Sequence, residues 1–191
     1  MSYAGIILAA GESSRMGSPK ALLDFRGETF LDRLIRRFEE HCTPVIVVLG
    51  HHPDVIRSGV RSPGTAKFVL NTEYQHGQLS SLQCGLRALP SDTEGVVFTP
   101  VDHPNFESAT VSQLIRSHAL IAIPQHLGRH GHPVLFSSTL VPEFLALTPD
   151  EQARTVLHRH VSDIRYIDVP DRGVLDDIDD PAAYYALLAS L

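Results

Sequence analysis

Small and basic residues follow the first apolar segment of the chain, and their spacing is the clearest sign of chemistry in the sequence. In the string LAAGESSRMGSPK, residues 8–20, Arg15 and Lys20 lie among glycines and serines. Gly11 and Gly17 allow backbone angles that other residues resist, and successive backbone amides in such a loop can bind phosphate oxygens. The two cations would supply the positive charge that a triphosphate needs. The stretch therefore favours a nucleotide-phosphate loop, and the alternative is a surface loop that merely carries two cations.

Two common phosphate-binding motifs do not fit this loop. A Walker A loop needs Gly-x4-Gly-Lys-Ser/Thr, and a dinucleotide fingerprint needs Gly-x-Gly-x-x-Gly. The sequence contains neither string. This counts against a P-loop enzyme and against an oxidoreductase with a dinucleotide-binding fold.

Acidic residues occur at two further places where a metal ion could be held. Asp102 closely follows the apolar segment GVVFTP, residues 95–100, and the run DDIDD covers residues 176–180. Mg²⁺ is usually held by one or two carboxylates together with substrate phosphates. Asp102 could instead be a turn former, and Asp180 is best explained as the N-cap of a helix that begins at Pro181.

Strand and helix patterns alternate along the chain and must position these residues. Apolar residues at helical spacing predict helices over residues 29–41, 78–89, 107–118 and 180–191. Short apolar runs predict strands at residues 4–9, 45–49, 67–70, 95–99, 120–123, 133–136 and 164–169. The alternation predicts an α/β fold with a three-layer, doubly wound, mostly parallel sheet, in one domain over residues 1–191. Ligands of such sheets bind beyond the carboxyl ends of the strands, where the basic loop and Asp102 are expected.

Composition excludes several other classes of protein. The chain has 191 residues, of which 43% are hydrophobic and 20% charged, as in ordinary globular proteins. A net charge of −6 lacks the field that binds DNA or RNA, so we expect no nucleic-acid partner. The two cysteines have no paired spacing, which argues against a disulfide scaffold and fits a cytoplasmic location. The first apolar run is too short to span a membrane, and we expect neither a signal peptide nor a membrane anchor.

The loop resembles the signature Leu-Ala-(Ala/Gly)-Gly-x-Ser-x-Arg-Met-Gly-x-x-Lys of the MobA-like nucleotidyltransferases. The resemblance continues in NTEYQHGQLSSLQCGL, TPVDHPNF, GRHGHPVLF and VLDDIDDPAAY, and covers nearly the whole chain. It is closest to the branch that transfers CMP or a similar nucleotide to molybdopterin. The resemblance implies a Rossmann-like fold of the nucleotide-diphospho-sugar transferase type. It also implies a Mg²⁺-dependent reaction that takes a nucleotide from a nucleoside triphosphate and releases pyrophosphate.

The same resemblance implies roles for residues of this sequence. Arg15 and Lys20 would bind the triphosphate, and Lys20 would reach the reacting centre. Asp102 would hold Mg²⁺, with Asp179 as the second ligand and Asp177 as the alternative to it. The nucleotide site would consist of Leu8, Ala9, Ala10, Gly11, Ser13, Ser14, Gly17, Asn71, Ser80, Ser81 and Gly85. The acceptor side would contain His103, Arg129 and His132.

The chain departs from the family pattern at a few positions. Ala10 stands where relatives have a second glycine, which suggests CTP, although GTP and ATP stay open because one position cannot fix the base. His103 replaces the usual Gln, His130 replaces a common Arg and Val101 replaces a common Gly. The loss of a fixed charge beside the acceptor weakens the case for a pterin phosphate.

Three interpretations follow from these residues. The first is transfer of CMP from CTP to molybdopterin, with a molybdenum hydroxylase as a candidate protein partner. The second keeps the reaction but changes the acceptor to a sugar phosphate, an alditol phosphate or phospholactate. The third is a non-catalytic protein that binds a nucleotide or the molybdenum cofactor and delivers it to an oxidoreductase. A carrier would not need both Asp102 and Asp179, so these two acids discriminate between the interpretations.

Overall fold

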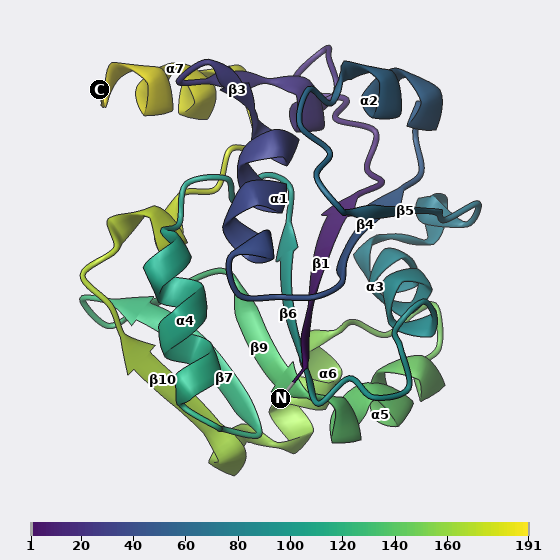
Figure 1. Ribbon diagram of the computed structural model, residues 1–191, viewed down its shortest axis with the longest axis vertical. Coiled ribbons are helices and arrows are strands. Elements are labelled where there is room, and N and C mark those ends of the chain that lie inside the picture. Colours follow the sequence, from purple (N-terminus) through teal and green to yellow (C-terminus); the bar gives the residue numbers. More distant parts are fainter. Residues whose placement is uncertain (1, 191) are drawn as a thin grey trace.

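An eight-stranded sheet passes through the centre of the molecule (Figure 1). The computed structural model describes residues 2–190, so Met1 and Leu191, the ends of the expected domain and of the last predicted helix, lie outside the described residues. The order of the strands is β10–β7–β9–β6–β1–β4–β5, and β8 pairs with β7. These strands are β1 (Tyr3–Ala9), β4 (Val45–Leu49), β5 (Lys67–Leu70), β6 (Gly95–Pro100), β7 (Ile121–His126), β8 (Arg129–His130), β9 (Val134–Ser137) and β10 (Ile164–Asp168). A separate small hairpin consists of β2 (Asp24–Phe25) and β3 (Glu28–Thr29).

Most neighbouring strands are parallel, as the alternation of strand and helix patterns predicts. β5, β4, β1 and β6 run in one direction, and β10 runs parallel to β7. β9 runs against both β6 and β7, and β8 pairs antiparallel with β7. Every strand expected from the sequence is present. The strands β2, β3 and β8 were not expected, because a two-residue strand carries no periodic pattern.

Helices cover both faces of the sheet (Figure 1). On one face lie α1 (Phe30–Glu39) and α4 (Ser108–Arg116), and on the other lie α3 (Gln78–Arg87) and α5 (Val141–Ala146). Each face has its own cluster of buried apolar side chains, with Phe38 in one cluster and Leu82 in the other. This arrangement confirms the predicted three-layer α/β fold. The other α-helices are α2 (Pro53–Gly59), α6 (Arg154–Arg159) and α7 (Pro181–Ala189).

The predicted cap of the last helix is confirmed. The Asp180 side chain accepts a hydrogen bond from the Ala183 amide at 2.8 Å, and Pro181 begins α7. This hydrogen bond satisfies an amide that the helix itself leaves unpaired. Between residues 2 and 190, no helix is both long enough and apolar enough to cross a bilayer.

The loops that follow β1, β4 and β6 meet at one end of the molecule. The amide of Val101 donates to the carbonyl of Leu8 at 3.0 Å, and the amide of His51 donates to the carbonyl of Ala10 at 3.0 Å. These bonds continue the sheet register for a residue or two beyond the strands. They therefore bring the basic loop and the segment that carries Asp102 to the same edge of the sheet.

Candidate active site

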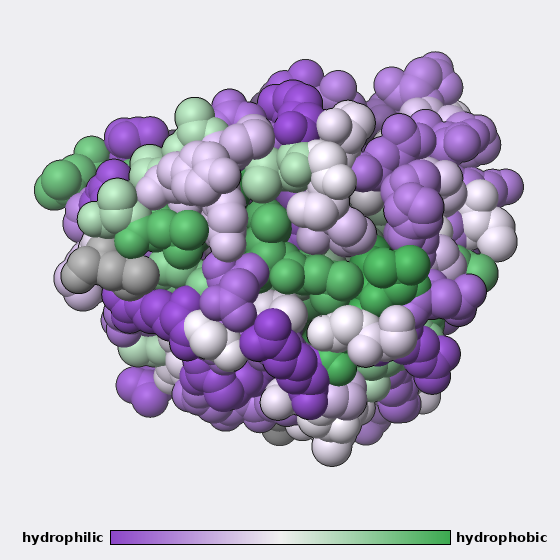
Figure 2. Space-filling model, turned by 90° about the horizontal axis from the view of Figure 1, so that it is seen from above, coloured by the Kyte–Doolittle hydropathy of each residue, from purple (hydrophilic) through white to green (hydrophobic). Residues whose placement is uncertain are grey.

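A cavity of about 250 Å³ lies beyond the carboxyl ends of β1 and β6. Figure 2 looks down on this end of the molecule and shows hydrophobic side chains in a band between hydrophilic groups. Most of the predicted nucleotide-binding residues line the cavity, namely Leu8, Ala9, Ala10, Gly11, Ser13, Ser14 and Ser81. Arg15, Lys20, Asp102 and Asp179 line it as well. The residues expected to bind phosphate and metal therefore share one cavity with the expected base pocket.

Other predicted nucleotide-binding residues lie behind this lining. Buried Asn71 donates from Nδ2 to the Oγ atoms of Ser80 and Ser81, at 2.9 and 3.1 Å, and so fixes the first turn of α3. Gly85 is buried where α3 meets the sheet, and a Cβ at this position would lie 2.9 Å from Cγ2 of Ile6. Gly85 therefore allows close packing of the helix against the sheet and is not among the residues that line the cavity, so its place in the nucleotide site stays a prediction.

The loop after β1 is held by its own hydrogen bonds. Ser13 has a left-handed φ of 53°, and its carbonyl accepts from the Met16 amide at 2.9 Å. Its Oγ accepts from the Lys20 amide at 3.0 Å. Left-handed conformations are uncommon outside glycine and cluster at binding loops. Gly17, with φ of 68°, lines a neighbouring hollow beside the cavity. The turn fixes the direction in which Lys20 leaves the loop.

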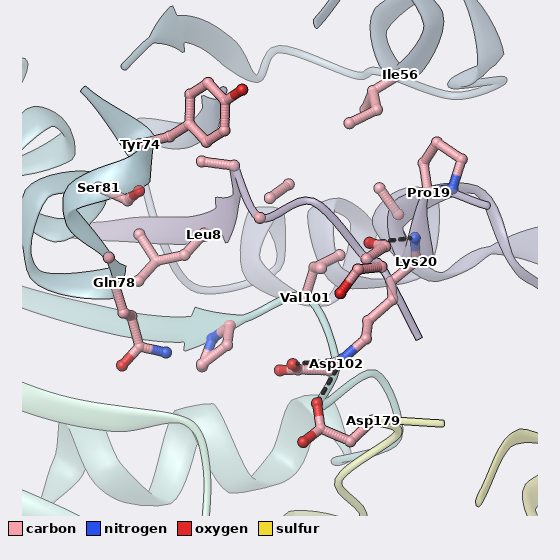
Figure 3. A pocket seen from close by; sticks show the side chains of 18 of the residues that line it. Leu8, Pro19, Lys20, Ile56, Tyr74, Gln78, Ser81, Val101, Asp102 and Asp179 are labelled. Carbon is pink, nitrogen blue, oxygen red and sulfur yellow. Dashed lines mark hydrogen bonds and ion pairs between the residues drawn. The ribbon is translucent and has the colours of Figure 1, made fainter. Parts of the chain in front are cut away.

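Lys20 is the centre of the charge network in this cavity (Figure 3). Its Nζ lies 3.1 Å from Oδ2 of Asp102 and 2.5 Å from Oδ1 of Asp179. Arg15 donates from Nη2 to Oδ2 of Asp179 at 2.9 Å. The Lys20 residue is 8% exposed, so its ammonium depends on these carboxylates. Three distant segments of the chain thus converge on one buried amine.

The charged groups shift one another's pKa values. Burial disfavours the charged form of Lys20, but Asp179 and Asp102 outweigh burial and raise the pKa of the ammonium above its ordinary value. The hydrogen bond from Lys20, supported by Arg15, lowers the pKa of Asp179. Burial raises the pKa of Asp177, and the charges of Asp102 and Asp179 add to this effect. Lys20 is therefore cationic and Asp179 anionic at neutral pH.

Three potential metal ligands lie beside this network. Asp102, His103 and Asp177 each offer one ligand atom, and these atoms lie within 4.8 Å of one another. Carboxylate oxygens with an imidazole nitrogen are a donor set that suits a divalent cation. Asp179 is not part of this group, and its two oxygens accept hydrogen bonds from Lys20 and Arg15.

Two of the predicted acceptor-side residues are in ring contact with each other next to these acids. The rings of His103 and His132 have centroids 4.4 Å apart, and the buried Nδ1 of each has no hydrogen-bond partner among residues 2–190. Burial, with a contribution from His103, lowers the pKa of His132 to about 3, so its ring is neutral. Arg129, the third predicted residue, is exposed on β8 and does not line the cavity.

Hydrogen bonds tie together the two segments that carry the acids. Nδ2 of Asn105 donates to Oδ2 of Asp176 at 2.8 Å, and the Ile178 amide donates to the carbonyl of Asp102 at 2.8 Å. From α1, Nε of the buried Arg33 donates to the carbonyl of Pro104 at 3.1 Å. Asn105 and Asp176 lie in the strings TPVDHPNF and DDIDD, but their hydrogen bond is not visible in the sequence. The contacts form when α1 and the C-terminal segment pack against the loop after β6.

The cavity also contains residues that sequence reasoning missed. Ile56, Tyr74 and Gln78 line it (Figure 3). The Tyr74 hydroxyl lies 3.2 Å from Nδ1 of His51. The three lining residues come from α2, from the turn before α3 and from α3 itself. Tyr74 and Gln78 lie within the string NTEYQHGQLSSLQCGL, whereas no motif of the sequence marks Ile56.

Known proteins share the sequence pattern of this chain. The family described as MobA-like NTP transferase domain matches residues 5–164. The molybdenum cofactor cytidylyltransferase of Escherichia coli (strain K12) is 27% identical over 178 residues, which are 92% of this chain and 90% of that protein. A probable molybdenum cofactor guanylyltransferase of Bacillus cytotoxicus is 29% identical over 115 residues, which are 59% of this chain and 55% of that protein.

Solved structures share the fold over the full length of the chain. The crystal structure of Rv0371c from Mycobacterium tuberculosis H37Rv superposes with a TM-score of 0.86 at 28% identity, with 100% of both chains covered. A structure of Rv0371c in complex with manganese has a TM-score of 0.81 at 25% identity, again with 100% of both chains covered. The signature loop, the doubly wound sheet and these matches agree, and the chain belongs to the MobA-like NTP transferase family of nucleotidyltransferases.

Proposed function

We propose that this nucleotidyltransferase transfers CMP from CTP to molybdopterin and releases pyrophosphate. An oxygen of the acceptor phosphate attacks the α-phosphorus, the bond between the α-phosphorus and its bridging oxygen to the β-phosphate breaks, and pyrophosphate leaves with that oxygen. The observation that carries the proposal is the contact of Lys20 with Asp102 and Asp179 in the cavity lined by the signature loop.

The cavity suits a nucleotide with its base at the small residues of the loop. Ala9, Ala10 and Gly11 leave the main chain open to the edge of a base, and no heavy atom lies within 4 Å of the place where a Cβ of Gly11 would be. Arg15 and Lys20 would lie along the phosphates. Ala10 favours CTP, and so does the likeness to the cytidylyltransferase of Escherichia coli.

Catalysis of this reaction rests on positioning and on neutralisation of charge. A phosphate oxygen needs little help from a base at neutral pH, so aligned reactants and fixed cations lower the barrier. Lys20 would leave its two carboxylates and bind the phosphates of the nucleotide. Asp102 and Asp179 would then hold Mg²⁺, which supplies positive charge at the α-phosphate when it is bound.

Three further points complete the proposal. His103 and His132 would face the acceptor, because His103 lies 4.0 Å from Oδ1 of Asp102 and its ring contacts that of His132. Exposed Arg129 would reach the acceptor by movement of its long side chain. The chain would act as one nucleotidyltransferase domain in the cytoplasm, and a molybdenum hydroxylase would receive the product.

The test is to incubate the protein with Mg²⁺, each nucleoside triphosphate and each candidate acceptor, and to measure pyrophosphate release. We expect CTP with molybdopterin to give the highest rate. Asp102→Asn should abolish release, whereas Asp92→Asn, a change at an exposed acid before β6, should not. A faster reaction with a sugar phosphate would replace the acceptor. Binding of CTP without pyrophosphate release from any acceptor would favour the carrier interpretation.

A further inference from the structure

We infer that Asp102, His103 and Asp177 form a second cation position with a nitrogen ligand, which binds transition-metal ions such as Mn²⁺ or Co²⁺ before any nucleotide is bound. The position deepens the proposed function, because it uses Asp102. It is distinct from the position between Asp102 and Asp179, and its test needs no nucleotide.

The two oxygens of Asp102 face different partners. Oδ2 lies 3.1 Å from Nζ of Lys20, and Oδ1 lies 4.0 Å from Nε2 of His103. One carboxylate can therefore contribute to two neighbouring positions. The ligand atoms of Asp102, His103 and Asp177 are close enough for one ion to draw them together, since all lie within 4.8 Å of one another.

The two cation positions differ in whether a protein group already occupies them. The ammonium of Lys20 lies between Asp102 and Asp179, 2.5 Å from the nearer oxygen, so a metal ion must displace it. The exposed carboxylate of Asp177, by contrast, has no hydrogen bond or ion pair with the part of the chain that the structure describes. It lies near the like charge of Asp102, and a cation between the two would remove their repulsion. The second position is thus open in the protein without nucleotide.

His103 gives this position its selectivity. Its side chain is 14% exposed, and its ring packs against the ring of His132 in a tilted arrangement, so the ring is held beside the acids at little further cost in entropy. Its Nδ1 is buried without a hydrogen-bond partner among residues 2–190, which leaves the ring's hydrogen-bonding capacity unmet. Mg²⁺ selects oxygen ligands, whereas imidazole suits first-row transition metals. The ligand set therefore favours Mn²⁺ or Co²⁺ over Mg²⁺.

The experiment is a titration of the metal-free, nucleotide-free protein with Co²⁺, followed by visible absorption and by calorimetry, and repeated with Mg²⁺. We expect Co²⁺ to bind more tightly than Mg²⁺. His103→Gln and Asp177→Asn should each weaken Co²⁺ about 10-fold to 100-fold, the range by which even supporting residues of metal sites act. His103→Gln should also change the absorption bands, because a nitrogen ligand is lost. Asp179→Asn should weaken Co²⁺ less than Asp177→Asn does, because Asp179 acts on this position only through its charge and through Lys20.

Matched controls and opposite outcomes make the test decisive. His158→Gln and Asp92→Asn change an exposed histidine on α6 and an exposed acid before β6, and neither should affect Co²⁺. Asp177 is exposed, so Asp177→Asn keeps the fold even if His103→Gln does not. Failure to bind Co²⁺ without nucleotide would overturn the inference. Loss of binding in Asp179→Asn but not in Asp177→Asn would do the same. Pyrophosphate release with Mg²⁺ is measured separately, so Co²⁺ binding in a protein that transfers no nucleotide would remove the proposed function alone.

Discussion

Two groups of polar side chains lie side by side at the active site and differ in how well they are satisfied. In the first, Lys20 and Arg15 contact Asp102 and Asp179 at hydrogen-bonding distance. In the second, the contacting rings of His103 and His132 each have a buried Nδ1 without a hydrogen-bond partner within residues 2–190. We call them the paired group and the histidine pair.

This difference in hydrogen bonding predicts a different free-energy cost for each group when a ligand binds. On the proposed roles, the paired group would exchange contacts inside the protein for contacts to the ligand, so part of the binding free energy would offset the lost contacts. Its side chains would, in return, already be held close to where they act. The histidine pair gives up nothing, because an unmet polar atom in a buried place gains from any partner. Four predictions test this contrast.

Removal of the central cation should have the largest effect. Lys20→Met keeps the length of the side chain but leaves Asp102 and Asp179 without their ammonium. We expect kcat for pyrophosphate release to fall by about 10²-fold to 10³-fold, as when one fixed donor is removed from an active site. Steady-state rates measure this, with circular dichroism to verify folding and Asp92→Asn as the control. Near-normal turnover would show that the paired group is not catalytic.

The histidine pair should make the fold sensitive to acid. The unfolded chain protonates His132 below its ordinary pKa of 6.5, whereas the folded protein resists protonation down to about 3. The unfolded state therefore binds more protons in this window, and stability is lost as the pH falls through it. The slope from this one group is up to about 1.4 kcal/mol per pH unit.

Urea denaturation at several pH values measures this slope. His132→Gln should flatten it above about pH 5, where most ordinary carboxylates stay ionised. His158→Gln serves as the control, because this histidine is exposed on α6. Equal slopes for wild type and His132→Gln would contradict a neutral, buried ring.

The connection between the acidic segments should have an intermediate effect. Asn105→Ala removes the hydrogen bond to Asp176 and should cost about 1–2 kcal/mol of unfolding free energy. Asn105→Asp should cost more, because it places two carboxylates within hydrogen-bonding distance. Both changes should also weaken Co²⁺ binding, since Asp102 and Asp177 lie on the two connected segments. An unchanged Co²⁺ affinity would mean that the segments stay in place without Asn105.

The smallest effect should come from the exposed edge of the paired group. The side chains of Arg15 and Asp179 are 66% and 40% exposed, so Arg15→Gln should lower stability by less than about 1 kcal/mol. The loss should shrink further at high salt. The same change should raise KM for CTP, because Arg15 would contact the triphosphate. A large loss of stability would mean that this pair is structural.

The sequence predicted the layers of the fold but not all of its strand directions. The apolar runs of β1, β4 and β6 are typical of strands buried on both faces, whatever their direction. The direction of β9 is set by its connection. The chain between His126 and Val134 is too short for the crossover that a parallel neighbour requires, so β9 lies antiparallel to β7. The short connection between β7 and β9 therefore predicts the direction of β9, whereas the apolar pattern of the strand does not.

At the site, the sequence predicted that the basic loop and Asp102 lie together. It did not predict which acid of residues 176–179 contacts Lys20 and which lies beside Asp102 and His103. The side chains of neighbouring residues in the extended segment 176–179 point in different directions, and a one-residue shift of that segment would exchange their positions. The buried side chain of Ile178 and the hydrogen bond from its amide to Asp102 fix the position of the segment. No local sequence pattern predicts this position. The supporting contacts of Arg33 and Asn105 were hidden for the same reason, since they join segments far apart in the chain.

The place of the Lys20 ammonium between two carboxylates makes anion and cation binding interdependent. On the proposed roles, a cation would enter between Asp102 and Asp179 once the amine moves out, and an arriving anion would bind the amine. Each ligand would then raise the affinity for the other, and by thermodynamic reciprocity the two enhancement factors would be equal. One lysine would thus make the cavity bind the two ligands together far more strongly than either ion alone.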